Sequence, residues 1–141
     1  PIDLVGENDP SIPLTVMEAL LQWEGCDAVI NLGILGRRIF LKRLADSVEH
    51  VDPSYTREFL DDAVQAFSDF ENSYIEQIVQ LMEKYGKPVF GVSLLTDEKD
   101  ATVYRVKGHH LKGVFYETPE RAVKAAARMV EYQRFRNRNA G

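Results

Sequence analysis

The segment from Asn31 to Arg38 holds the residues whose types and spacing come nearest to phosphate chemistry. It follows an apolar run, opens a helical pattern and places Gly36 directly before Arg37 and Arg38. A glycine at a helix entrance lets backbone N–H groups approach an anion, and the two arginines add positive charge. The lysine of a Walker loop and the triple glycine of a dinucleotide fingerprint are both missing, so we expect no free-standing nucleotide site. A tight strand-to-helix turn with two solvated arginines is the alternative.

A second strand-to-helix joint lies near the C-terminus, where an apolar run over 114–116 is followed by Thr118 and Pro119. Thr118 suits the N-cap of a helix, and Pro119 suits its first turn. In open α/β sheets such joints form the edge that faces ligands, because the free N–H groups and the helix dipole point outward there. Thr118 is therefore a further ligand-facing candidate.

The three histidines do not indicate a metal or catalytic site. His109 and His110 are adjacent, so their side chains diverge in any regular element, and neither has a His or Cys partner four residues away. His50 lies near the end of a predicted helix, where a partly charged imidazole complements the helix dipole. We therefore expect structural roles for these residues and no bound metal.

The single cysteine, Cys26, cannot form an internal disulfide, which favours a reducing, cytoplasmic location. With no histidine placed to activate it, we expect half-buried packing rather than nucleophilic chemistry. Asp3, Asp27 and Asn31 could approach one another at a sheet. They belong to separate segments whose alignment the sequence does not define, so paired-carboxylate catalysis is not indicated.

Composition indicates one ordinary globular domain over residues 1–141, with 45% hydrophobic and 28% charged residues. The net charge of −5 argues against a nucleic-acid surface. The arginines at 134, 136 and 138 are more typical of a solvated tail. No run approaches the roughly 18 apolar residues of a membrane span, and no signal peptide is recognisable. The abrupt start at Pro1 is what a fragment of a longer protein, or a processed protein, would show.

Hydrophobic periodicity predicts alternating strands and helices. Strands are expected over 27–35, 89–95 and 114–116, with 2–5 as a short strand or an extended entry, and helices are expected over 13–23, 37–51, 54–85 and 119–134. The run over 27–35 is almost continuously apolar, as in a parallel strand covered on both faces. This order is typical of parallel crossover units, which place a helix layer on each face of the sheet. We therefore predict an α/β fold with a short, mostly parallel sheet in a three-layer sandwich.

The third predicted helix is unusually long. Asp52 is its expected N-cap and Pro53 its first residue, and the apolar period continues to Tyr85, where Gly86 ends it. At 1.5 Å per residue an unbroken helix would reach roughly 48 Å and overhang the domain. We therefore expect a break near residues 69–73.

Four segments in this order resemble the ligase-CoA domain of NDP-forming acyl-CoA synthetases, a flavodoxin-like, Rossmann-like module also found in succinyl-CoA synthetase-like proteins. They are residues 1–6 (Pro-Ile-Asp-Leu-Val-Gly), 25–30 (Gly-Cys-Asp-Ala-Val-Ile), 86–92 (Gly-Lys-Pro-Val-Phe-Gly-Val) and 116–123 (Tyr-Glu-Thr-Pro-Glu-Arg-Ala-Val). The resemblance spans nearly the whole chain. The helical region from 37 to 70 is longer than is usual in that family and forms an extended insertion.

The resemblance implies one part of a ligase that converts acyl-CoA, NDP and phosphate to acid, CoA and NTP through a phosphohistidine. That histidine, and the sites for CoA and for ATP or ADP with Mg, belong to CoA-binding, phosphohistidine-bearing and ATP-grasp domains elsewhere. The chain alone is therefore expected to bind no cofactor and to be inactive. In relatives, a glycine turn starts a helix that faces the phosphohistidine, and Leu35, Gly36 and Arg37 match that position.

Two alternatives remain. The long helical hairpin from 37 to 85 could make the chain a non-catalytic regulatory or interaction module, with a homodimer as one outcome, because a broad apolar stripe on an overhanging helix favours a protein partner. An independent flavin or nucleotide carrier is the weakest hypothesis, since the sequence contains no phosphate loop.

Overall fold

The computed structural model describes residues 1–4, 9, 11–52, 54–93 and 102–139. Within these ranges the helices are α1 (Ile12–Gln22), α2 (Arg37–Val51), α3 (Arg57–Tyr85) and α4 (Pro119–Asn139). The strands are β1 (Val29–Leu32), β2 (Val89–Val92), β3 (Val103–Arg105) and β4 (Lys112–Tyr116). Their order in the sheet is β1-β2-β4-β3, where β1, β2 and β4 are parallel and β3 is antiparallel to β4. The predicted α/β class and mostly parallel sheet are confirmed.

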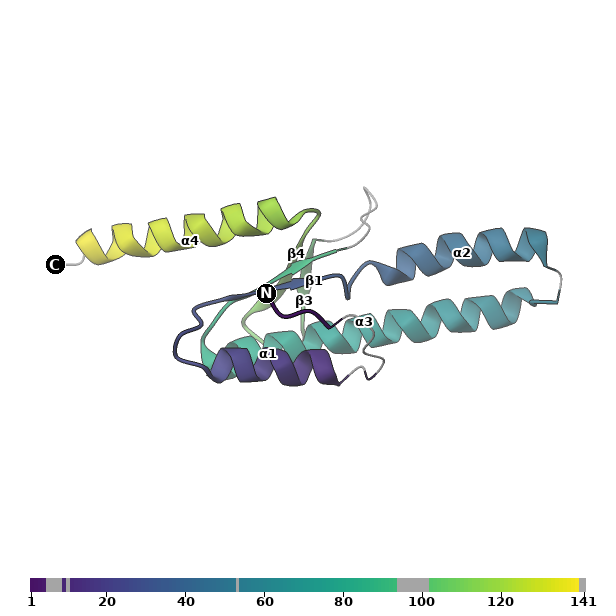
Figure 1. Cartoon of the computed structure of the whole chain (residues 1–141), viewed down its shortest axis with the longest axis horizontal. Coiled ribbons are helices and arrows are strands. Elements are labelled where there is room, and N and C mark those ends of the chain that lie inside the picture. The colour runs from purple at the N-terminus through teal and green to yellow at the C-terminus, as the bar shows by residue number, and fades with distance from the viewer. Residues whose placement is uncertain (5–8, 10, 53, 94–101, 140–141) are drawn as a thin grey trace.

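The sheet lies between two helix layers, with α1 and α3 on one face and α4 on the other (Figure 1). The larger core lies between α1, α3 and the sheet, and its fully buried side chains include Leu21, Tyr74 and Ile78. The smaller core packs Phe90 and Val92 of β2 against Ala122 of α4. Successive side chains of a strand point to opposite faces of its sheet. Val89 of β2 therefore belongs to the larger core, and Phe90 and Val92 belong to the smaller one.

Several local features follow from identifiable residues. Thr56 caps α3, since its Oγ1 accepts a hydrogen bond from Phe59 N at 3.3 Å. Gly86 ends that helix in the left-handed conformation, with φ of 65°, which only glycine adopts without strain. The predicted stop at Gly86 is therefore confirmed.

Two predictions about element boundaries are wrong. The start of α3 is not at Asp52, because Asp52 ends α2 and its carboxylate accepts hydrogen bonds from Ser54 N and Ser54 Oγ; Pro53 lies outside the described residues. The expected break near 69–73 is absent, since α3 runs unbroken over 29 residues. Its overhanging part is packed along α2 rather than left alone.

At the N-terminus, the strand that was one of the two expectations does not form. Residues 1–4 form no strand, and Val5 lies outside the described residues. A four-residue alternation is too short a signal to specify a strand. β3 was not expected, because a three-residue strand of mixed polarity leaves no clear period. The predicted strand over 89–95 is confirmed as β2 through Val92, and residues 94 and 95 lie outside the described part.

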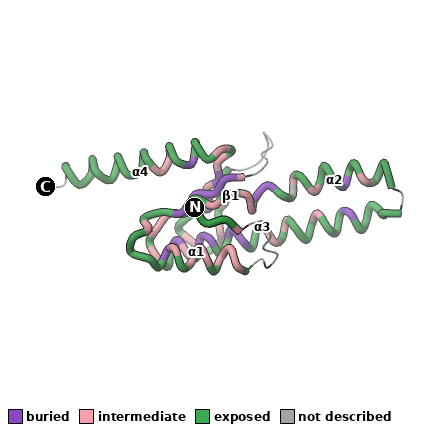
Figure 2. The backbone as a smooth tube through the Cα atoms, in the orientation of Figure 1, coloured by how far each residue is buried: buried purple, intermediate pink, exposed green. Residues whose placement is uncertain are grey.

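Two helical segments extend beyond the sheet in opposite directions (Figure 1). One is α2 with the antiparallel first half of α3, residues 37–70, which we call the helical hairpin. The other is the C-terminal half of α4. Both are largely exposed, whereas the buried residues concentrate around the sheet and the parts of α1 and α3 beside it (Figure 2). In the described parts, no helix combines the length and apolar character needed to cross a bilayer.

Candidate functional site

The three parallel strands end level with one another at one edge of the sheet. Leu32 pairs with Val92, and Val92 pairs with Tyr116. Backbone hydrogen bonds continue this register one residue further, from Gly33 N to Val92 O at 3.4 Å and from Ser93 N to Tyr116 O at 3.0 Å. The β1–α2 turn and the β4–α4 turn therefore lie at the same carboxyl edge, on either side of β2. This is the edge at which open α/β sheets bind ligands.

The β1–α2 turn is built around two glycines and one buried anchor. Gly33 and Gly36 have φ of 83° and 85°, values that glycine adopts without a Cβ clash. Between them Leu35 is buried in the larger core at 5% exposure, which fixes the turn to the sheet. Gly36 is the N-cap of α2. The turn thus begins α2 with a residue that has no side chain to occupy its first N–H groups.

The positive charge at this turn comes from Arg37. Its side chain is exposed, and its Nε donates a hydrogen bond to Gly33 O at 3.1 Å. That contact folds the side chain back over the turn and keeps the guanidinium charge near the α2 N-terminus. Arg38 lies in α2, and its side chain is outside the described residues.

The β4–α4 turn is organised differently. Thr118 Oγ1 accepts a hydrogen bond from Arg121 N at 3.3 Å, so the predicted N-cap is confirmed. Glu120 lies in the first turn of α4, and its pKa is below the ordinary value because its carboxylate accepts hydrogen bonds from its own backbone N–H and from Thr118. Arg121 also forms an ion pair with Glu117. Thr118 therefore shares the edge with Gly36, but its side chain is already used within the turn.

The remaining candidates from the sequence are placed apart from this edge or serve the fold. His50 Nδ1 lies 2.7 Å from Asp46 O, one turn back on α2. Cys26 is half-buried, as predicted, and its Sγ donates to Ala28 O at 3.4 Å. Asn31 points to the α3 side of the sheet, where its Nδ2 donates to Tyr74 Oη at 3.0 Å.

Sequence reasoning missed a carboxylate that binds the β3–β4 connection to α3. Glu83 accepts hydrogen bonds from His109 Nδ1 and His110 N, both at 2.7 Å, and from Leu111 N at 3.1 Å. These bonds, that of His109 foremost, lower the pKa of Glu83 to about 2. No sequence signal links residues so far apart, so only the fold could reveal the contact.

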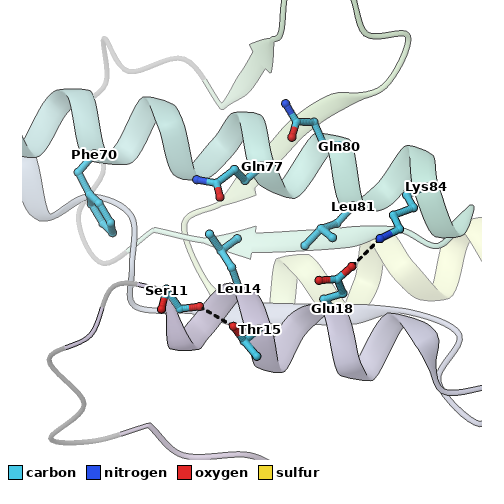
Figure 3. A pocket seen from close by; sticks show the side chains of 9 residues that line it. All are labelled: Ser11, Leu14, Thr15, Glu18, Phe70, Gln77, Gln80, Leu81 and Lys84. Carbon is cyan, nitrogen blue, oxygen red and sulfur yellow. Dashed lines mark hydrogen bonds and ion pairs between the residues drawn. The ribbon is translucent and has the colours of Figure 1, made fainter.

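A groove of about 600 Å³ between α1 and α3 was also not expected (Figure 3). Leu14, Leu81 and Phe70 supply its apolar lining. At one end Lys84 Nζ lies 2.7 Å from Glu18 Oε1, so the two charges neutralise each other. That contact raises the pKa of Lys84 to about 12. The groove therefore offers no free charge at this end.

No group of three or more His, Cys, Asp or Glu side chains among the described residues could hold a metal ion. Scans of the chain against protein-family models, curated proteins and solved structures give no match. The carboxyl edge is therefore the best-supported candidate site by its geometry alone.

Proposed function

We propose that the chain is a flavodoxin-like module of an NDP-forming acyl-CoA synthetase, and that its carboxyl edge faces a phosphoryl group on a histidine of a neighbouring domain. The observation that carries this proposal is the β1–α2 turn. Leu35 anchors it to the core, Gly36 opens α2 in a left-handed conformation, and Arg37 folds back over it. The proposal also draws on the resemblance of four sequence segments to the ligase-CoA domain.

The role of the turn would be electrostatic. The N-terminus of a helix carries roughly half a positive charge and presents N–H groups that have no partner within the helix. Gly36 adds no side chain that would compete for them, and the guanidinium of Arg37 adds a full charge nearby. Donors held in place before a phosphoryl group arrives stabilise its developing charge without reorganisation. The module would thus orient and stabilise the group, while the phosphorylated histidine lies on another domain.

Nucleotide, CoA and Mg²⁺ are assigned to other domains under this proposal. Among the described residues, no group of three or more His, Cys, Asp or Glu side chains could hold a metal ion. The isolated chain is accordingly expected to have no ligase activity.

A titration followed by NMR tests the anion-facing turn. The ¹⁵N-labelled chain is titrated with inorganic phosphate and with acetyl phosphate, and we expect saturable shifts of the amide signals of residues 35–38. Arg37→Gln should weaken this binding by roughly threefold, the size expected for one exposed charge. Arg43→Gln, which removes the same charge from the same helix further along, is the matched control and should leave it unchanged. Shifts confined to other residues would remove the proposed role.

A second candidate function is supported by a separate observation. The helical hairpin exposes large apolar side chains, among them Phe40 at 56% and Phe59 at 58%. Exposed apolar patches of this kind mark protein interaction sites. The chain would then act as an interaction module, either beside the ligase role or in place of it.

A further inference from the structure

The exposed apolar side chains of the helical hairpin form two regular series. On α2 the series is Phe40, Leu44 and Val51, and on α3 it continues through Phe59 and Phe67. Phe40 and Leu44 are four residues apart, so they lie on one side of α2. By contrast, Ala45 and Leu60 are buried where α2 and α3 pack together.

The two series lie on the same side of the hairpin. Leu44 directly precedes buried Ala45, and Phe59 directly precedes buried Leu60. Leu44 and Phe59 are therefore each rotated by about 100° in the same sense from the α2–α3 contact, whereas Phe67 lies nearer to that contact. Because the helices run in opposite directions, equal rotations bring both series to one face. We call this face the hairpin face.

The two helices of the hairpin differ in charge. In α2 the basic residues outnumber the acidic ones, with Arg37, Arg38, Lys42 and Arg43 against Asp46 and Glu49. In the α3 part of the hairpin the acidic residues dominate, with Glu58, Asp61, Asp62 and Asp69 against Arg57. Because α2 and α3 differ in net charge, the hairpin is complementary to a copy of itself turned so that α2 meets α3.

We propose that the hairpin face binds a second copy of this chain and forms an antiparallel four-helix bundle with both tips pointing the same way. In this arrangement α2 of each copy packs on α3 of the other, and every neighbouring pair of helices is antiparallel and opposite in net charge. The reverse arrangement, tip to base, would stack α2 on α2 and the acidic α3 on α3. Charge complementarity therefore selects the first arrangement.

The arrangement brings one specific pair of charges together across the interface. At the hairpin tip, Arg57 Nη1 lies 2.9 Å from Glu49 Oε2, which aligns the two helices. Arg43 is six residues before Glu49, and Asp62 is five residues after Arg57, so the two residues lie at a similar height along the hairpin. Each is two residues from the buried residue of its helix, Ala45 or Leu60, and therefore lies on the outer edge of the hairpin, away from the α2–α3 contact. Within one copy they are on opposite edges. In the bundle, Arg43 of one copy lies beside Asp62 of the other.

Sedimentation equilibrium of the whole chain tests the proposal. We expect a reversible monomer–dimer equilibrium whose monomer has a mass of 16.0 kDa. Phe40→Ser combined with Phe59→Ser should raise the dimer Kd by at least roughly tenfold, as loss of aromatic anchors does. Tyr132→Ser combined with Phe135→Ser removes similarly exposed aromatic residues from α4. This matched control should change the Kd by less than about twofold.

Charge reversal tests the arrangement and does not depend on core packing. Arg43→Asp and Asp62→Arg should each weaken the dimer by roughly threefold, and the double variant should recover the original Kd within about twofold. Circular dichroism would verify that every variant keeps its helical content. A double variant that binds no better than the weaker single variant would overturn the proposed arrangement.

Two other results would overturn the proposal as a whole. The first is that the chain stays monomeric up to a concentration of about 1 mM. The hairpin face would then be a binding surface for a different protein. The other is a dimer that the α4 variant abolishes and the hairpin variant preserves. This inference rests on the second candidate function and not on the anion-facing turn. The phosphate titration and the sedimentation experiment can therefore fail independently.

Discussion

At the scale of single residues, Glu83 shows how one carboxylate can hold a connection in place. It reaches from α3 to His109, His110 and Leu111, and three hydrogen-bond donors converge on its two oxygens. Because these bonds favour the charged form, the pKa of Glu83 falls from its ordinary value of 4.5 to about 2. The folded state therefore binds the proton of this group less tightly than the unfolded state does.

The consequence is an acid sensitivity with a defined window. A depressed pKa contributes stability that is fully present above pH 4.5 and is lost as the pH falls toward about 2. Glu83→Gln removes the titration, so the unfolding free energy of the variant should fall less steeply across this window than that of the wild type. Urea unfolding at several pH values measures this slope. Glu76→Gln, also on α3, is the control and should behave like the wild type.

Amide exchange provides an independent readout of the same contact. In Glu83→Gln the amide hydrogens of His110 and Leu111 should exchange faster than in the wild type, because an amide side chain cannot accept all three bonds. Unchanged exchange at both residues would mean that Glu83 does not hold the connection.

The role of a residue at a helix boundary could be predicted where it depends only on the neighbouring residues in the sequence. Thr118 and Gly86 act as the cap and the stop that their sequence neighbours indicate. Asp52 was misassigned because an Asp before a Pro suits both a helix start and the turn that actually forms with Ser54. Glu83 lies 26 residues from His109, and no local rule connects the two.

At the scale of elements, the sheet depends on glycines that make room for one ring. Phe115 of β4 is buried at 5% exposure and lies over neighbouring β2. A Cβ added at Gly91 would lie only 1.8 Å from Phe115 Cδ1, and one at Gly113 would lie 2.8 Å from Ile75 Cγ2. The close approach of β2, β4 and α3 therefore requires both glycines.

Gly91→Ala should accordingly destabilise the protein. Forcing the Phe115 ring to move in a packed core costs about 1–3 kcal/mol of unfolding free energy, measurable by urea denaturation. In a Phe115→Ala background the same substitution should cost less than about half as much, because its steric partner is gone. Equal costs in the two backgrounds would show that Phe115 is not the obstacle.

Helices and parallel strands were predicted well because their periods extend over many residues. The apolar stripes of α1, α2 and α4 and the apolar run of β1 identified each element. β3 was missed because a three-residue antiparallel strand gains its stability from pairing with β4. The unbroken length of α3 was missed for the same reason, since α2 supports its overhang.

At the scale of the whole molecule, the carboxyl edge and the hairpin face lie on different parts of the fold. The edge lies at the ends of β1, β2 and β4, and the hairpin extends beyond the sheet (Figure 1). The sequence identified the turn at Gly36 from local residues. It did not reveal that both apolar series of the hairpin share one face, because that depends on how α2 and α3 pack.

The separation of these two surfaces has a functional consequence. The proposed hairpin face uses none of residues 35–38 of the turn, so the two candidate functions are compatible within one protein. Phe40→Ser combined with Phe59→Ser, which changes the hairpin face only, should therefore leave phosphate binding at residues 35–38 unchanged.

ATP formation from acyl-CoA, ADP and phosphate tests the proposed phosphoryl-facing role of the β1–α2 turn in the clearest way. It is measured with the full-length product of the gene that encodes this chain, together with any subunit that co-purifies. We predict ATP formation that falls by roughly tenfold or more in Arg37→Gln, the scale of losing one electrostatic contact to a reacting phosphoryl group, and that is retained in Arg43→Gln. Absence of ATP formation with every acyl-CoA supplied, or equal rates in Arg37→Gln and the wild type, would contradict the proposed role of the turn.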